Sequence, residues 1–205
     1  MGGGDINVFI KMMNDRAKEL GCTNTHFVNP NGLPAEDHYT SARDMALIGR
    51  AALNNEELAQ IMATKSMQIP PTNKHAEPTL LNNHHAMYNY YQTNRYLYDP
   101  CLGGKTGYTD AARNTLVTFA EREGMKLVCV VMCAESPYHY EDTTNLFNYC
   151  FANFKVEDVS GMDNLFTSIG DNGIGVLAEN IDLLKAEVTG NVVLPKTVDV
   201  GQVSV

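Results

Sequence analysis

The chain has 205 residues, of which 44% are hydrophobic and 19% are charged, a composition typical of a folded globular protein. A chain of this length buries roughly 70% of its unfolded surface, so it can build a core without disulfides or metals. Fifteen Lys and Arg residues against 24 Asp and Glu residues give a formal net charge of −9. Because such a surface repels phosphate backbones and anionic lipid headgroups, the composition argues against nucleic-acid and membrane-surface roles.

Two further classes of segment are not expected. The longest apolar run, residues 127–134, has eight residues, whereas a membrane-spanning helix needs about 20. The first residues lack the basic region and the apolar stretch of a signal peptide.

The five cysteines form no Cys-x-x-Cys pair, and Cys129 and Cys133 should lie roughly 13 Å apart along one strand, beyond the about 7 Å limit for a disulfide. We interpret Cys129 and Cys133 as small buried hydrophobic side chains.

Helical spacing dominates the first 63 residues. Apolar residues at helical spacing predict a helix over residues 5–20, which Gly21 caps. A turn-forming cluster in residues 24–34 prevents a helix there. Ser41, followed three residues later by an aspartate, predicts the start of a second helix that runs to about residue 53. A short third helix is predicted over residues 56–63.

The next 37 residues have a different character. A strand is predicted over residues 66–69 and is ended by two prolines. Residues 80–100 contain five of the ten tyrosines. One interpretation is a wall that binds sugars or peptides. We favour the other, a long surface connection in which the rings pack flat and the hydroxyls stay in water.

Two apolar segments, residues 114–120 and 126–134, are joined by a polar turn that contains a glycine and predict a hairpin. The second segment is apolar almost throughout, which predicts a central strand that is covered on both faces. Helical spacing returns over residues 141–154. Helices, then an antiparallel hairpin, then a helix indicate an α+β fold, with helices packed on an antiparallel sheet. Valines without helical spacing in residues 156–205 predict the beginning of a small all-β domain.

The strongest local motif is the sequence GGKTG at residues 103–107. It resembles the end of a phosphate-binding loop, but that loop requires a glycine where Asp99 stands, and a helix should follow at once. The alternative is a K-T-G strand at a sheet edge. In that arrangement Lys105 supplies a positive charge and Thr106 a hydroxyl for a substrate carboxylate, while Gly107 leaves room for a peptide beside the strand.

The surroundings of this motif resemble a known family. NTHFVNPNGLP at residues 24–34 and HYTSARDMALI at residues 38–48 are similar to the low-molecular-weight penicillin-binding proteins. So are GGKTGYTD at residues 103–110 and NTLV at residues 114–117. Within that group the chain resembles the serine-type D-alanyl-D-alanine carboxypeptidases. The resemblance implies that residues 1–155 are the C-terminal part of the transpeptidase-like domain and that residues 156–205 begin the C-terminal β-rich domain.

The resemblance also implies a function and a site. The family removes the terminal D-alanine of peptidoglycan stem peptides outside the cytoplasm, through a serine acyl-enzyme that β-lactam antibiotics trap. Lys105, Thr106 and Gly107 fall on the family's K-T-G, and Lys105 takes part in catalysis. The backbone N–H of Tyr108 is expected to be one of two oxyanion donors. No cofactor is implied, and any membrane anchor is expected outside these residues. Asn83 and His84 lie in a stretch that borders the cleft in this family.

Four of the six histidines also have structural interpretations. Adjacent histidines at 84 and 85 without a third ligand at suitable spacing make a metal site improbable, and we expect them in a solvated loop. His26 and His38 are assigned to loop structure. Arg113 stands where some relatives carry glycine, so the loop after Lys105 is expected to differ in shape.

The catalytic nucleophile is missing from this sequence. No serine is followed by lysine at the third position, and none begins a Ser-x-Asn motif. The family places both motifs before the predicted first helix, so we expect these residues to be the rear portion of the enzyme and to be inactive alone. The alternative is a non-catalytic module that binds peptidoglycan or another peptide in the K-T-G groove. A β-lactamase is a third candidate, which the long family blocks disfavour.

Overall fold

The computed structural model describes residues 2–91, 93–160 and 190–199, and the chain divides into two compact units. The first comprises Met1–Arg122 and Lys126–Asn148, and the second Glu123–Met125 and Tyr149–Val205. The helices are the 3-10 helix η1 (Gly2–Gly4), α1 (Ile6–Glu19), α2 (Ala42–Leu53), α3 (Glu56–Met62) and α4 (Tyr138–Asn153). The strands are β1 (Ser66–Ile69), β2 (Thr79–Asn82), β3 (Cys101–Thr109), β4 (Arg113–Arg122), β5 (Met125–Ala134), β6 (Phe154–Asp158) and β7 (Asn191–Pro195).

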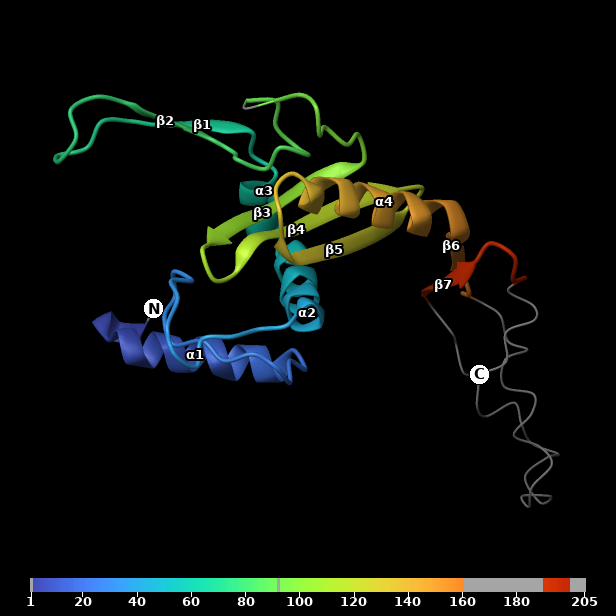
Figure 1. Ribbon diagram of the computed structural model, residues 1–205, viewed down its shortest axis with the longest axis horizontal. Coiled ribbons are helices and arrows are strands. Elements are labelled where there is room, and N and C mark those ends of the chain that lie inside the picture. Colours follow the sequence, from blue (N-terminus) through green and yellow to red (C-terminus); the bar gives the residue numbers. More distant parts are fainter. Residues whose placement is uncertain (1, 92, 161–189, 200–205) are drawn as a thin grey trace, which may run out of the picture. The chain divides into compact units, whose positions relative to one another are not determined.

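The α+β fold predicted from the sequence is confirmed. β3, β4 and β5 form a three-stranded sheet in that order, and the β3–β4 pair is antiparallel (Figure 1). The hairpin of β1 and β2 is a separate two-stranded sheet. Its second strand was not predicted. In the second unit, β6 and β7 pair antiparallel. The domain boundary after residue 155 stays a prediction.

One strand assignment is wrong. The apolar run of β5 predicted a central strand, but β4 is the central strand and β5 lies at the edge of the described sheet. A continuous apolar run reports that a strand is covered on both faces, not that it has neighbours on both edges. β5 meets only part of that expectation, because Cys129 is buried while most of its residues are half-buried. Cys133 is exposed, so the prediction that it is a buried side chain is wrong.

Helices cover both faces of the central strand. On one face, the Cβ of a residue at position 49 of α2 would lie 3.2–3.3 Å from the side chains of Val117, Phe119 and Val128, so glycine there allows close packing. On the other face, buried Leu116 packs with Met87, Cys101 and a group of tyrosines that includes Tyr140 of α4. Successive residues of a strand point to opposite faces, which explains how Leu116 and Val117 serve different layers.

The tyrosine-rich segment before β3 is only partly the surface connection that we favoured. Tyr90 and Tyr91 are exposed, but the same segment buries Met87 and its neighbours in the core. The Tyr98 ring stacks on Phe147 of α4, 5.7 Å between centroids, and its hydroxyl donates to Asn148. The segment therefore forms part of the layer that covers the sheet.

A buried aspartate fastens the long loop after α1 to α2. Ser41 caps α2 by accepting a hydrogen bond from the backbone N–H of Asp44. The Asp44 carboxylate, fully buried, accepts hydrogen bonds of 2.7 Å from the Asn24 backbone and from the Thr25 hydroxyl. Burial alone raises the pKa of Asp44, but these hydrogen bonds outweigh it and hold the pKa below its ordinary value. The loop of residues 24–34 is thereby held to the start of α2.

Two consecutive glycines allow β3 to approach its neighbours closely. A Cβ on Gly103 would lie 2.6 Å from the Met62 carbonyl oxygen at the end of α3. One on Gly104 would lie 2.1 Å from the Val117 carbonyl oxygen and 2.9 Å from Nε2 of His85. Both have positive φ, +121° and +154°, which side chains rarely tolerate.

We predict that Gly104→Ala destabilises the fold by about 3 kcal/mol or more, because backbone strain adds to a collision with backbone that cannot move aside. Gly21→Ala is the matched control, since Gly21 also has positive φ (+83°) but no atom near its Cβ position. It should cost only about 1 kcal/mol. Urea unfolding of both variants checks this, and equal losses would contradict the close approach at Gly104.

The buried histidine behind Gly104 leads to a second prediction, on how stability depends on pH. His85 is 1% exposed and its Nε2 lies 3.0 Å from the Thr118 hydroxyl, and burial lowers its pKa to about 4. Above pH 6.5 both folded and unfolded states hold it neutral. As the pH falls from 6.5 towards 4, only the unfolded state takes up the proton, so stability decreases by about 3 kcal/mol through this residue.

The measurement is the free energy of unfolding at pH 7 and near pH 4 for the wild type, His85→Gln and His75→Gln. His85→Gln should lose about 2–3 kcal/mol less over this interval than the wild type. His75, exposed in the β1–β2 loop, is the control, and its variant should follow the wild type. The same pH dependence in all three proteins would show that His85 does not titrate in this way.

Candidate K-T-G site

The K-T-G residues lie in the second half of β3, where the sequence analysis placed a strand. Lys105 pairs with Val117 of β4, Thr106 with Leu116, and Gly107 with Thr115. Lys105 and Gly107 are exposed and Thr106 is half-buried. The Lys105 ammonium donates to the carbonyl oxygen of Thr106, so its charge is held over this part of the strand.

Gly107 has no room for a side chain. A Cβ there would lie 2.5 Å from the Thr115 hydroxyl oxygen, closer than real Cβ contacts allow. Any other residue would therefore force the Thr115 side chain to rotate or the strands to shift. Glycine keeps the surface of β3 open at the point where the sequence predicted that a peptide lies alongside it.

A cavity of about 640 Å³ opens beside these residues within the first unit. It is lined by residues from β3, β4, α4 and three loops: Asn31, Gly32, His84, Lys105, Thr106, Gly107, Tyr108, Thr109, Ala112, Asn114, Thr115, His139 and Tyr140. We call it the K-T-G pocket. The predicted residues Lys105, Thr106, Gly107 and Tyr108 are therefore together in one cavity.

The electrostatics of the K-T-G pocket oppose those of the whole chain. None of its lining residues is Asp or Glu, although the chain carries a net charge of −9. Its ionisable lining includes Lys105 with His84 and His139. Because no acidic side chain lines the pocket to repel an anion, and Lys105 supplies a fixed positive charge, the pocket suits an anionic group such as a carboxylate.

The two adjacent histidines have different environments. His84 is exposed and lines the pocket, as expected of a residue that borders the cleft. His85 is buried behind β3, so its assignment to a solvated loop is wrong. Asn83 acts as a support: its amide donates to the carbonyl oxygens of Met62 and Thr64 at 3.0 and 3.2 Å, and its Oδ1 accepts from the His85 backbone.

Sequence reasoning missed two lining residues from α4. His139 is 5% exposed, and burial lowers its pKa in spite of opposing effects from the Glu135 backbone and the Asp142 charge. Its ring lies 3.9 Å from the ring of Tyr140, centroid to centroid. Thirty-four residues separate Lys105 from His139 and no motif joins them, so only the packing of α4 on the sheet brings them together.

The loop after β3 leads into Arg113, and its expected difference in shape from relatives stays a prediction. Arg113 has a φ of +55°, a backbone conformation that favours glycine, and its guanidinium pairs with Glu135 at 2.6 Å. His26 and His38 are engaged within their loop: Nδ1 of His26 lies 2.7 Å from the Asp37 carbonyl oxygen, and the Val28 backbone donates to His38.

Within the described residues, no group of three or more Cys, His, Asp or Glu side chains is arranged to hold a metal ion. No helix in the described part of the chain combines the length and the apolar character needed to cross a membrane.

Comparison with known proteins identifies the relatives of the chain. Residues 1–136 match the family model described as D-alanyl-D-alanine carboxypeptidase. The curated D-alanyl-D-alanine carboxypeptidase DacB2 of Mycobacterium tuberculosis is 35% identical over 158 residues, which cover 74% of this chain and 50% of that protein. The chain spans half or less of the length of the curated relatives at the head of this comparison.

Solved structures of D-alanyl-D-alanine carboxypeptidases are also similar to the chain. The crystal structure of a D-alanyl-D-alanine carboxypeptidase from Mycobacterium tuberculosis is 34% identical, with a TM-score of 0.63 over 73% of this chain and 55% of that one. The carboxypeptidase DacD of Francisella tularensis, at 24% identity, shares the fold with a TM-score of 0.70 over 95% of this chain and 57% of its own. The match of the family model over residues 1–136 shows that the chain belongs to the D-alanyl-D-alanine carboxypeptidase family.

Proposed function

We propose that this chain is part of a serine-type D-Ala-D-Ala carboxypeptidase that removes the terminal D-alanine of peptidoglycan stem peptides. The observation that carries the proposal is the K-T-G pocket, which presents a lysine, a threonine and no acidic side chain in a strongly acidic chain. A peptide that ends in a free carboxylate matches this chemistry. The substrate class itself is carried over from the family.

Each pocket residue has a defined part in substrate binding. The Lys105 ammonium and the Thr106 hydroxyl hold the terminal carboxylate by charge-assisted hydrogen bonds. The peptide lies along β3, where Gly107 leaves space. The Tyr108 backbone N–H donates to the oxyanion that forms at the carbonyl under attack, a type of contact worth about 3 kcal/mol in the transition state.

The chemical step needs a nucleophile that these 205 residues lack. In the proposed reaction, a serine hydroxyl attacks the carbonyl carbon between the two D-alanines and passes its proton to a neighbouring base. The C–N bond then breaks, the leaving amine takes up a proton, and free D-alanine departs. Water hydrolyses the resulting ester and regenerates the serine. A penicillin follows the same path to the ester, so it should acylate the same serine. Since its substrate is a cell-wall peptide, the enzyme acts outside the cytoplasm.

The second candidate is a non-catalytic peptide-binding module. The absence of Ser-x-x-Lys and Ser-x-Asn among the six serines favours it. The two candidates agree on the pocket and differ in the residues that the gene encodes ahead of this sequence.

The test uses the protein extended upstream along its gene. A penicillin should add its mass to a serine within a Ser-x-x-Lys motif in that upstream part, and the 205-residue chain should release no D-alanine from a D-Ala-D-Ala peptide. An upstream sequence without such a motif would overturn the enzyme in favour of the binding module. Turnover by the 205-residue chain would contradict the missing-nucleophile argument.

In the extended protein, Lys105→Ala should slow acylation by fluorescent penicillin about tenfold to a hundredfold, the factor that matches loss of a charged hydrogen bond. Lys105→Arg should lose less, because it keeps the positive charge. Lys74→Ala, an exposed lysine in the β1–β2 loop, is the matched control. Acylation that is unchanged in Lys105→Ala would remove Lys105 from the site.

A further inference from the structure

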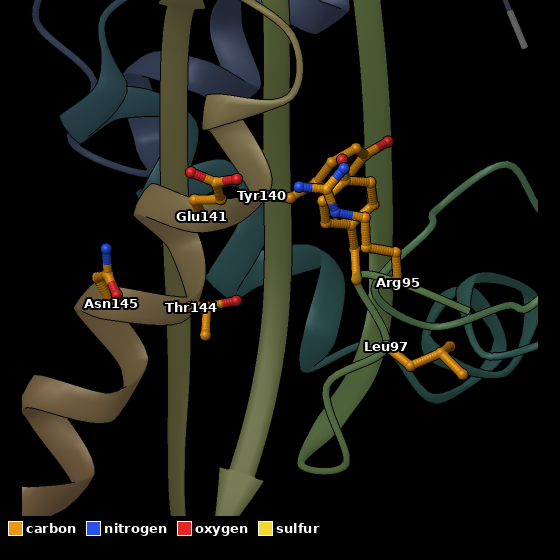
Figure 2. Close-up of a pocket in the computed structure, with 7 residues that line it drawn as sticks. Arg95, Leu97, Tyr140, Glu141, Thr144 and Asn145 are labelled. Atoms are coloured by element: carbon orange, nitrogen blue, oxygen red, sulfur yellow. The ribbon is translucent and has the colours of Figure 1, made fainter. Parts of the chain in front are cut away.

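A second cavity of about 370 Å³ shares a wall with the K-T-G pocket, because Tyr140 lines both. Figure 2 shows the residues that line this second cavity: Arg95 and Leu97 come from the segment before β3, and Tyr140, Glu141, Thr144 and Asn145 come from α4. Its volume falls within the range of about 300–1,000 Å³ that is usual for small-molecule sites. We call it the Arg95 pocket.

A series of ring and cation–π contacts connects Arg95 to the common wall. The guanidinium carbon of Arg95 lies 5.3 Å from the centroid of the Tyr96 ring, which stacks on Tyr140 at 4.8 Å. Tyr140 in turn contacts His139, which faces the K-T-G pocket. A cation–π contact uses the charge of the guanidinium and none of its N–H donors as hydrogen bonds, so these donors stay available to a ligand. The Arg95 guanidinium is thus held beside the Tyr96 ring without an ion pair to another described residue.

The polar lining of the Arg95 pocket contains one positively and one negatively charged side chain. Arg95 provides a cation and Glu141 an anion, and no ion pair within 4.0 Å between these two or to any other described residue is present. Glu141, Thr144 and Asn145 lie at positions i, i+3 and i+4 of α4, so they share one face of that helix. The hydroxyl of Thr144 and the amide of Asn145 complete the polar side.

We propose that the Arg95 pocket binds a free amino-acid end, in which one carbon carries both a carboxylate and an ammonium group. The Arg95 guanidinium receives the carboxylate, and Glu141 receives the ammonium, so each charge in the pocket gains an opposite charge from the ligand. A purely anionic or purely cationic ligand leaves one of the two unpaired.

Two sources supply this chemistry, and both rest on the proposed function. One is the D-alanine that the reaction releases beside the shared wall. The other is the side-chain end of a diamino acid within the stem peptide. Both present the same dipolar group to the pocket and differ in what is attached to it.

The experiment titrates the isotopically labelled 205-residue chain and follows backbone amide resonances of Leu97, Thr144 and Asn145. The probes are D-alanine, meso-2,6-diaminopimelate, acetate and methylammonium. We expect the two dipolar probes to shift these resonances in the millimolar range and the two single-charge probes to shift them far less. Tighter binding of D-alanine assigns the released product as the source, and tighter binding of diaminopimelate assigns the peptide side chain.

Variants identify the residues responsible. Arg95→Gln and Glu141→Gln should each weaken binding about tenfold or more, because each removes one charge-assisted contact. Arg95→Lys keeps the charge and should weaken binding less. Arg50→Gln, an exposed arginine in the last turn of α2, is the control and should bind as the wild type does. Thermal melts of every variant separate lost binding from lost folding.

The possible results of these experiments test this inference separately from the proposed function. Acetate shifts as large as those of D-alanine, no shifts with any probe, or binding unaffected by Arg95→Gln would each overturn the inference. Binding that is lost in Lys105→Ala and retained in Arg95→Gln would place the ligand in the K-T-G pocket, which overturns this site but not the enzyme. Arg95-dependent binding in a protein whose extended form is not acylated by penicillin would support the site and count against the enzyme.

Discussion

The close backbone approach at Gly103 and Gly104 is the constraint on which the rest of the first unit depends. These residues bring β3 against the end of α3 on one side and against His85 and β4 on the other. The K-T-G residues follow directly, so their position is set by contacts made just before them. His85, buried and neutral, fills the space that a side chain at Gly104 would take. A buried, closely packed support therefore lies behind the exposed and polar surface of the K-T-G residues, an arrangement that suits the proposed binding site.

The second organising principle is the separation of charge. The chain as a whole is acidic, yet the residues lining the K-T-G pocket include a lysine and two histidines and no carboxylate. Charge of one sign around a pocket of the other sign concentrates the field in the pocket. The buried carboxylate of Asp44 has a different role, because its hydrogen bonds are to the loop that supplies Asn31 and Gly32 to the pocket rim.

Local patterns in the sequence were sufficient for the helices and for the existence of strands in residues 101–134, because capping residues, helical spacing and glycine-containing turns act over a few residues. Lys105, Thr106 and Gly107 were singled out for the same reason, as a compact motif, whereas their roles and the choice of Tyr108 came from the family resemblance. His139 and Tyr140 were missed because their place beside Lys105 depends on how α4 packs, which no short-range signal encodes. The β5 assignment failed because apolar character reports coverage of faces, and strand order is decided by hydrogen bonds along edges. The tyrosine-rich segment was misjudged in part, since its tyrosines are exposed at positions 90 and 91 and half-buried at 88, 96 and 98, without a regular period.

The position of β5 has a consequence for handling the protein. Its ten residues are almost all apolar, and within the described sheet only β4 pairs with it. An edge strand of this length and composition presents backbone donors and acceptors to any other extended chain, including another copy of itself. Charged residues flank it, with Lys126 near its start and Glu135 just past its end, but none interrupts the run between them. Purification at low concentration, and a charged substitution in the middle of β5 where a side chain is half-exposed, are therefore the practical means of keeping these residues in solution.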